Sequence, residues 1–530
     1  MNIAEHNKII TNKGYSIRKS YLSETQKDLI QKNCIVEPKT DDRFATKGEL
    51  KFKIYLESPE RYYLPREWAI QKFGKPDIDI LSEGITLSDE IINFKGNPYD
   101  YQINIIETYL NADRNGLICV PCGKGKTFMA LNIASRIKKK FLIVVDKEFL
   151  MNQWKQEIHA LMPNIRVGII QADKRQVGTE IIESDDPVIP ELKKIAKEHK
   201  LKVGGTKQEL IDRLKENNIE YKLPSIKIEY DCSICMIQTI CLQEFPKNFF
   251  SEYGFTIFDE CHHLGAQYFS KSLFKIQTKK MLGLSATPTR ADGLTKVFEM
   301  FLGKPLYWEK TREPDPSVEV KGVHITSQDP DYLKIPYDYK KDIILARLLT
   351  YIVECKERNQ EITRWITKLA SDGNRKILVL SARIAHLQEL EKMLPSSITV
   401  SYYIGGMKEE IRENGAKEAK VLLASYSMAS EAMNIKSLNA VILASPRSNV
   451  EQSTGRILRT RVSERIVQPM IIDIIDPHEP FTNQWKRRVA YYKKCSYDIE
   501  EIQQGKDAGT KQTSTISMKD LNECLFEDDD

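Results

Sequence analysis

The sequence lacks long hydrophobic runs and any large excess of charge of one sign. Its longest apolar stretches, such as residues 141–145, are far shorter than the roughly 20 residues that a membrane-spanning helix needs. The 530 residues carry 79 Lys and Arg against 74 Asp and Glu, a formal net charge of +5. Affinity for nucleic acid must then come from local basic patches. We therefore expect no contact with a membrane. We also expect that the overall electrostatic field of the molecule does not by itself bind nucleic acid.

The sequence also lacks a disulfide framework, a leader segment and internal repeats. Its ten cysteines are scattered unevenly, and Met1 is not followed by a charged and then apolar segment. This pattern indicates a reducing compartment, and we expect a soluble intracellular protein without a secretion signal. Repeats with a period of roughly 20 to 50 residues are absent, so the chain must be divided by its secondary-structure pattern.

Short runs rich in isoleucine and valine recur along the chain, with helical stretches between them. This alternation predicts an α/β fold in which a mostly parallel sheet is covered by helices. The runs form two series, at 117–120, 141–145, 255–258 and 281–285, and then at 376–381, 420–425, 439–444 and 470–475. Two similar α/β units are therefore expected.

The composition of the intervening segments predicts the boundaries. Residues 1–90 are less regular and predict an N-terminal α+β accessory unit, and the Pro- and charge-rich stretch near 311–320 predicts a linker. We predict a first α/β unit over 91–310, a linker over 311–335, a second α/β unit over 336–500 and an acidic tail over 501–530.

One segment, residues 186–224, does not fit the α/β rhythm and predicts a small helical insertion in the first unit. Within 189–218, apolar residues at helical spacing predict two short amphipathic helices. Thr206 and Glu209 form a T-x-x-E capping box, which predicts where the second helix begins.

The stretch VPCGKGKT, residues 120–127, follows an apolar run and precedes a helical one, the setting of a phosphate-binding loop. Its glycines allow backbone N–H groups to point inward, Lys126 reaches the β- and γ-phosphates, and Thr127 ligates Mg²⁺. Val120 stands where the strict pattern has glycine. The predicted nucleotide ligands here are Pro121, Cys122, Gly123, Lys124, Gly125, Lys126 and Thr127.

The stretch TIFDECHHLG, residues 256–265, places two carboxylates directly after another apolar run. Asp259 would lie at the carboxyl edge of the sheet and hold Mg²⁺, while Glu260 would deprotonate the attacking water. A zinc site is the alternative, with donors from Cys232, Cys235, Cys241, Cys261, His262 and His263. Because Cys235 lies in an apolar run that predicts a buried strand, the magnesium interpretation is favoured.

The order of these motifs resembles that of the superfamily 2 helicases, specifically the XPB-type branch and its relatives in large DNA viruses. The resemblance covers about residues 90–310 and 370–500, through NPYDYQ (97–102), FLIVVDKEFLMNQW (141–154), CMIQT (235–239) and LSATPTRADG (284–293). It implies two tandem RecA-like domains, ATP with Mg²⁺ as cofactors, and Gln102 on the adenine side. It also implies that His262 contacts the S-A-T motif, Ser285, Ala286 and Thr287, which couples hydrolysis to movement.

Two later motifs complete the resemblance. QSTGRILR, residues 452–459, matches Q-x-x-G-R-x-x-R in full, which implies that Gln452 binds nucleotide and that Arg456 and Arg459 act as arginine fingers from one face of a helix. YSMASEAMNI, residues 426–435, matches its motif loosely: Glu431 is retained as a coupling residue, but Ala432 and Asn434 replace the usual Gly and Asp.

The motor motifs themselves do not distinguish DNA from RNA, because such motors bind phosphates that carry no sequence information. The insertion resembles a SAP motif, which implies contact with duplex DNA through Lys193, Lys194, Lys197, Lys207 and Arg213, although a solvated helical hairpin is the alternative.

We therefore expect an ATP-dependent DNA helicase or translocase in transcription, repair or replication. The other hypotheses are an RNA helicase or transcript-release factor and a non-hydrolysing DNA-binding scaffold. Expected partners are single- or double-stranded DNA, RNA as the alternative, and transcription machinery, in a virion or in the host cytoplasm or nucleus.

Overall fold

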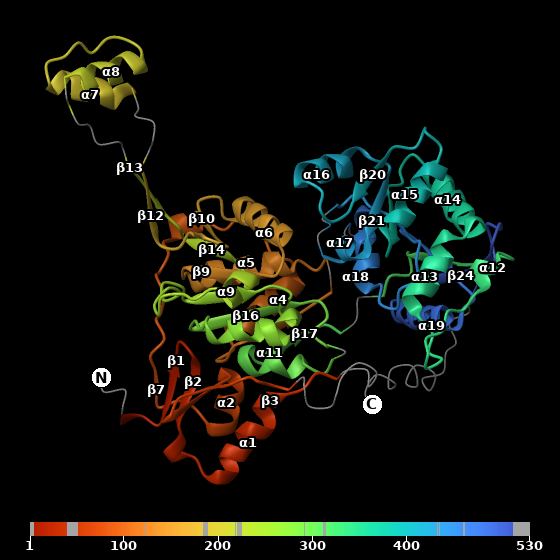
Figure 1. Ribbon diagram of the computed structural model, residues 1–530, viewed down its shortest axis with the longest axis horizontal. Helices are drawn as coiled ribbons and strands as arrows, with labels where there is room; N and C mark the ends of the chain where they lie inside the picture. Colours follow the sequence, from red (N-terminus) through yellow and green to blue (C-terminus); the bar gives the residue numbers. More distant parts are fainter. Residues whose placement is uncertain are drawn as a thin grey trace.

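The computed structural model (Figure 1) describes residues 5–39, 51–121, 123–183, 189–217, 219, 225–290, 292–310, 314–431, 433, 435–458, 460 and 462–511. Within these ranges the chain forms an N-terminal unit, two α/β units each built on an eight-stranded sheet, and a helical insertion. No helix within this part of the chain is both long enough and apolar enough to pass through a bilayer.

The N-terminal unit is built on a five-stranded sheet with the order β5-β6-β2-β1-β7. Its helix α2 (Arg66–Phe73) packs against α11 (Thr295–Leu302) of the first α/β unit. Arg66 donates hydrogen bonds to the carbonyls of Thr278 (2.8 Å) and Lys279 (3.2 Å). One hydrophobic core runs through both units, so they form a single packed body. The remaining elements are β1 (Lys8–Thr11), β2 (Gly14–Arg18), α1 (Glu24–Cys34), β3 (Ile35–Val36), β4 (Phe52–Lys53), β5 (Leu56–Glu57), β6 (Arg61–Leu64) and β7 (Ile78–Asp79).

The first α/β sheet has the order β11-β10-β14-β9-β15-β16-β8-β17 and is parallel except for the edge pair of β10 and β11. The four predicted apolar runs form its central strands β8, β9, β15 and β16, whose side chains are almost all buried, as expected for a parallel sheet covered on both faces. The strands are β8 (Gly116–Cys119), β9 (Phe141–Val145), β10 (Val167–Gln171), β11 (Lys174–Arg175), β14 (Cys232–Met236), β15 (Phe255–Phe258), β16 (Lys280–Ser285) and β17 (Pro305–Trp308). The other helices are α3 (Asp89–Ile92), α4 (Asp100–Leu110), α5 (Lys126–Ile137), α6 (Glu148–Leu161), α9 (Ile237–Leu242) and α10 (Gln267–Ser270).

The insertion stands on a two-stranded antiparallel stem and projects away from the rest of the molecule (Figure 1). We call residues 179–229, with their stem of β12 (Thr179–Glu183) and β13 (Ser225–Glu229), the arm. At its tip, α7 (Ile189–Glu198) and α8 (Lys207–Glu216) pack around a small core of their own, as predicted. The capping box is confirmed, because Thr206 accepts a hydrogen bond from the Glu209 N–H and the Glu209 side chain accepts one from the Thr206 N–H.

The second α/β sheet has the order β20-β21-β19-β22-β23-β18-β24-β25 and is parallel except for the edge strand β25. Its strands are β18 (Glu319–His324), β19 (Ile377–Ser381), β20 (Val400–Tyr403), β21 (Val421–Ser425), β22 (Ala440–Leu443), β23 (Met470–Ile475), β24 (Asp498–Gln503) and β25 (Thr510–Lys511). Its helices are α12 (Pro330–Leu333), α13 (Leu345–Glu354), α14 (Lys356–Ala370), α15 (Ile384–Met393), α16 (Glu409–Glu418), α17 (Tyr426–Glu431), α18 (Glu451–Thr454) and α19 (Glu479–Lys494).

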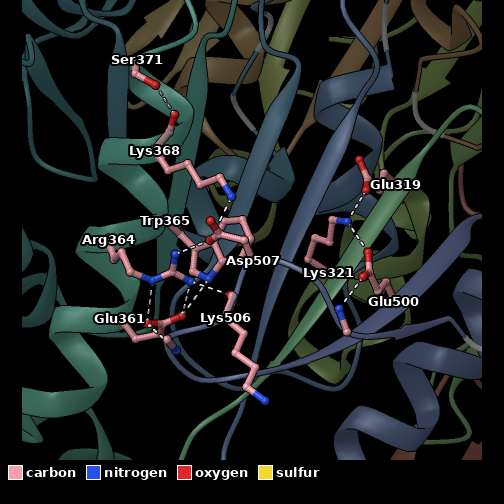
Figure 2. A network of polar contacts seen from close by, with 12 residues as sticks. Glu319, Lys321, Glu361, Arg364, Trp365, Lys368, Ser371, Glu500, Lys506 and Asp507 are labelled. Atoms are coloured by element: carbon pink, nitrogen blue, oxygen red, sulfur yellow. Dashed lines mark hydrogen bonds and ion pairs between the residues drawn. The ribbon is translucent and has the colours of Figure 1, made fainter.

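Two boundaries of the second unit lie elsewhere than predicted. Strand β18 falls inside the predicted linker 311–335, yet it pairs with β23 and β24 in the interior of the sheet. Strands β24 and β25 extend into the predicted tail 501–530. Charged side chains attach this region to its neighbours (Figure 2): Asp507 accepts from Arg364 and Lys368, and Lys321 of β18 lies between Glu319 and Glu500. The high charge of these segments concealed strands that pair through their backbones.

Candidate active site

The loop over 120–127 joins β8 to α5 and has the backbone geometry of a phosphate cradle. Gly123 and Gly125 have φ angles of +88° and +80°, a region that side chains other than glycine rarely adopt. A Cβ atom at Gly125 would also lie 2.5 Å from the Gln102 Nε2 atom, so a larger residue would displace that side chain from the loop. Helix α5 begins at Lys126. The free N–H groups of its first turn and the positive end of its dipole therefore point toward this loop.

Residues around α4 support this loop from one side. The buried Gln102 donates from Nε2 to the Lys124 carbonyl (3.2 Å) and accepts the Tyr99 N–H through Oε1 (3.0 Å). The Tyr101 hydroxyl donates to the same carbonyl (3.1 Å), and the Lys124 ammonium pairs with Glu309 (3.2 Å). Gln102 thus contacts the loop through its backbone, and its predicted adenine-side role stays a prediction.

Two carboxylates and a lysine meet at the carboxyl edge of the first sheet. Asp259 and Glu260 follow β15, and the Lys126 Nζ atom lies 2.9 Å from the Glu260 Oε1 atom. Asp259 accepts a hydrogen bond of 2.7 Å from the Trp154 indole N–H through Oδ2. The carboxyl ends of parallel strands share one edge, which is why residues separated by more than a hundred positions come together here.

The two carboxylates differ in their electrostatic surroundings. Burial raises the pKa of Asp259, and the neighbouring charge of Glu260 raises it further. For Glu260, burial raises the pKa, but the Lys126 ammonium and the nearby His262 outweigh it, so that the pKa falls well below its usual range. Glu260 is therefore ionised at neutral pH. A cation at Asp259 would favour the charged form of that carboxylate also.

His262 links these carboxylates to the next strand. Its Nδ1 atom lies 3.1 Å from the Ser285 Oγ atom and 3.3 Å from the Glu260 Oε2 atom. The Ser285 hydroxyl also accepts the Thr287 N–H (3.2 Å), and Ala286, between them, is buried. Arg290 NH1 donates to the His262 carbonyl at 2.6 Å. His262 is thus positioned between the carboxylate motif and the S-A-T motif, and its coupling role stays a prediction.

The zinc alternative finds no support in the geometry. Cys232 and Cys235 lie at the start and near the end of the buried strand β14, and burial raises the pKa values of both thiols. In the ranges that the structure describes, the one group of three or more potential metal ligands within reach of each other is Asp329, Cys355 and Glu357, in the second unit. The predicted zinc donors do not converge.

The arginine motif of the second unit has a different local structure from the one predicted. Instead of one helix over 452–459, α18 ends at Thr454 and a 3₁₀ helix spans Gly455–Leu458. The buried Arg456 donates from Nε to the Ala429 carbonyl (2.5 Å) and from NH1 to the Met433 carbonyl (2.8 Å). Arg456 therefore joins two motifs of its own unit. Helices α17 and α18 lie on the side of this unit that faces the first unit (Figure 1).

Several predicted residues cannot be placed. Cys122, Arg459, Ala432 and Asn434 lie outside the described residues. Glu431 ends α17 and Gln452 lies in α18, but their side chains are not among those described.

The predicted contacts of the arm divide into two groups. Lys193, Lys194 and Lys197 are exposed along α7, and Lys207 begins α8. Arg213, by contrast, donates from NH1 to the carbonyls of Lys202 and Gly204 in the turn between the helices. Its guanidinium stabilises the turn, so the exposed lysines of α7 are the stronger candidates for contact with phosphates.

Three contacts at this site were not predicted from the sequence. Trp154 was part of a quoted motif, but its bond to Asp259 was not expected. His263 Nε2 lies 3.5 Å from Asp146 Oδ2, and Gln238 donates to the Asp146 carbonyl at 2.7 Å. Single polar residues of this kind carry no signal in the sequence beyond their place at the ends of apolar runs.

Family comparisons agree with this geometry. Residues 95–290 match the family described as "Type III restriction enzyme, res subunit", and residues 359–461 match "Helicase conserved C-terminal domain". A variant of S. cerevisiae Dbp5 solved with RNA and ADP BeF3 shares the fold, with 12% identity, a TM-score of 0.50, and coverage of 79% of this chain and 94% of that one.

Viral proteins share sequence over most of the chain. A protein of Acanthamoeba polyphaga mimivirus named "Putative ATP-dependent RNA helicase" is 29% identical, over 93% of this chain and 86% of the relative. A protein of African swine fever virus with the same description is 25% identical, over 71% and 68%. A protein of Invertebrate iridescent virus 6 named "Putative helicase" is 23% identical, over 76% and 82%. The chain therefore belongs to the superfamily 2 helicases, with two tandem RecA-like domains, and is an ATP-dependent enzyme of that type.

Proposed function

We propose that the protein is a DNA-dependent ATPase that moves along DNA during transcription, repair or replication. The observation that carries the choice of DNA is the arm, which holds two helices away from the motor on a stem of its own, one of them with three exposed lysines. Lys193, Lys194 and Lys197 are exposed on α7, where they can contact phosphates. A tether of this kind would keep the motor on a duplex between steps.

Lys126, Thr127 and Asp259 would hold ATP with Mg²⁺, and they fit this role. The site offers an ammonium, a hydroxyl, a helix N-terminus and two carboxylates at one sheet edge, which is the donor set that a magnesium triphosphate requires. Mg²⁺ would neutralise charge that develops on the phosphoryl oxygens. Glu260, ionised beside Lys126, would accept the proton of the attacking water.

In this proposal the second domain would complete the site only when the two domains close on the nucleotide. Arg459 would supply a guanidinium to the γ-phosphate, and Arg456 would hold the 426–433 segment in place for that movement. Closing and reopening would then change the grip on the strand.

A panel of ATPase assays tests the substrate. We expect turnover to rise about tenfold or more with duplex or single-stranded DNA and to respond much less to RNA of equal length and sequence. Strand displacement on tailed duplexes then distinguishes unwinding from translocation alone. Stimulation by RNA and not by DNA would reverse the assignment.

Replacing residues 189–217 with a short Gly-Ser turn tests the arm while keeping its stem. We expect weaker duplex binding and a smaller slope of log affinity against log salt concentration, because each lost phosphate contact removes about 0.9 from that slope. Reversing the charge of Lys193, Lys194 and Lys197 to Glu should reproduce the effect, and charge reversal at the exposed Lys271, which belongs to the first domain and not to the arm, is the control. Unchanged affinity and slope in the arm variants would show that the arm is a solvated hairpin.

An RNA helicase or transcript-release factor is the second candidate, favoured by the names of the mimivirus and African swine fever virus relatives. The same ATPase panel decides between the two. The third hypothesis, a non-hydrolysing scaffold, is set aside because the chain belongs to an ATP-dependent family and retains Lys126, Asp259 and Glu260.

A further inference from the structure

Helix α6 lies between the second domain and the carboxylate motif. Its apolar face, with Leu150, Met151, Trp154 and Ile158 buried, packs on α5, β9 and β14 of the first domain. Two positions before Trp154, and so on nearly the opposite side of the helix, the Asn152 Nδ2 atom donates to the Glu409 Oε2 atom of α16 at 2.6 Å. One helix therefore touches both Asp259 and the other domain.

The bond between Trp154 and Asp259 is well shielded. Trp154 is 1% exposed, and its indole N–H can only donate. The other side-chain oxygen of Asp259, Oδ1, accepts the Glu260 backbone N–H (3.0 Å). With one oxygen bound to the indole and one to the backbone, these two donors fix the orientation of the Asp259 carboxylate.

A second connection ties the beginning of α6 to the same segment. Asp146 directly precedes the Lys147 N-cap of α6, and its carboxylate lies 3.5 Å from His263 Nε2. Its carbonyl accepts from Gln238, which lies in CMIQT, one of the motifs of the helicase resemblance. Movement of α6 relative to the sheet would therefore change contacts on both sides of Glu260.

We propose that Trp154 is a positioning residue: it sets the Asp259 carboxylate for Mg²⁺ according to the position of α6, which the second domain contacts through Asn152 and Glu409. The inference rests on the proposed function, in which Asp259 holds Mg²⁺. In this inference α6 transmits domain closure to the metal site, in addition to any contact that it makes with a nucleic-acid strand.

Trp154→Phe tests the link, because it removes the N–H and keeps an aromatic ring in the core. We expect the Mg²⁺ concentration for half-maximal equilibrium binding of a fluorescent nucleotide and for half-maximal DNA-stimulated ATPase to rise about fivefold or more, and maximal turnover to fall, as a bond to a charged group is lost. Glu409→Ala should reduce the stimulation by DNA about two- to threefold and leave the Mg²⁺ dependence of the unstimulated reaction unchanged.

Trp365→Phe is the matched control. Trp365 is likewise buried, 2% exposed, and donates its indole N–H to the Glu361 carboxylate (3.0 Å) inside the second domain (Figure 2). It should leave the Mg²⁺ dependence within about twofold of wild type. An equal Mg²⁺ dependence in the Trp154 and Trp365 variants would overturn the proposal.

Two further outcomes are separable. If wild-type ATPase responds to no nucleic acid, the proposed function fails, whereas a responsive wild type with an unaltered Trp154→Phe variant rejects only this link. If the Phe variant does not fold, benzothienylalanine introduced at position 154 makes the same comparison, because this tryptophan isostere has sulfur in place of the N–H group. The same rise in Mg²⁺ requirement is then expected, and its absence overturns the proposal.

Discussion

Lys126 and Glu260 form an ion pair of 2.9 Å, from residues 134 positions apart, at the centre of the candidate active site. The side chains are only 13% and 18% exposed, and His262 Nδ1 lies 3.3 Å from the other oxygen of Glu260. A nucleotide that binds Lys126 would release Glu260 to act on water.

We expect substitutions of the two residues of this pair to have different effects on nucleotide binding and on ATP turnover. Lys126→Ala should abolish both nucleotide binding and hydrolysis, because the phosphate partner is lost. Glu260→Gln should keep nucleotide affinity within a few-fold and lower turnover by about 10²–10⁴, the usual contribution of a general base. Equilibrium binding of a fluorescent nucleotide and steady-state ATPase measure the two effects. Lys275→Ala, which removes a more exposed pair with Glu244, is the control, and near-normal turnover in Glu260→Gln would reject its assigned role.

We expect substitution of Arg456 to lower the stability of the second domain as well as the activity. Arg456→Ala would leave the carbonyls of Ala429 and Met433 without their guanidinium donor, at a cost of about 2 kcal/mol in the free energy of unfolding. Thermal unfolding should therefore begin several degrees lower in the second domain. Arg459→Ala provides the comparison at the other arginine of the motif. An unchanged melting temperature in Arg456→Ala, with activity lost, would instead identify Arg456 as acting on the nucleotide alone.

His386 predicts a dependence of stability on pH. It is buried between Ser381 and Asn359, and burial, reinforced by the nearby Arg358 guanidinium, lowers its pKa to about 3. The unfolded chain takes up a proton below a pH of roughly 6.5, but the folded chain does not. Stability from this group is thus complete above that pH and falls by about 1.4 kcal/mol per unit below it. Chemical unfolding at pH 7.5 and 5.5 measures the loss.

His386→Leu is the matched variant for that experiment. It should be less stable than the wild type at pH 7.5, because Ser381 and Asn359 lose a partner, but its unfolding free energy should change less between the two pH values. An equal change in both proteins would exclude His386 as the source.

The local motifs were accessible from the sequence because their signals are short-range. The run at 141–145 predicts β9 at its observed bounds, since five consecutive apolar residues specify a strand buried on both faces. Thr206 and Glu209 predict the start of α8 through a three-residue spacing. Strands β18 and β24 escaped detection because their side chains include charges that pair with each other, such as Lys321 with Glu500, in place of an apolar pattern.

The sequence by itself determined the two α/β units, the phosphate loop, the carboxylate motif and the helical insertion, because each depends on residues within one turn, strand or cap. Only the tertiary structure decided which polar groups meet. Trp154 reaches Asp259 across 105 positions, and Arg456 bonds to carbonyls of its own domain. Such contacts depend on how strands are ordered in a sheet and how helices pack on it, and no local pattern of residues encodes that order.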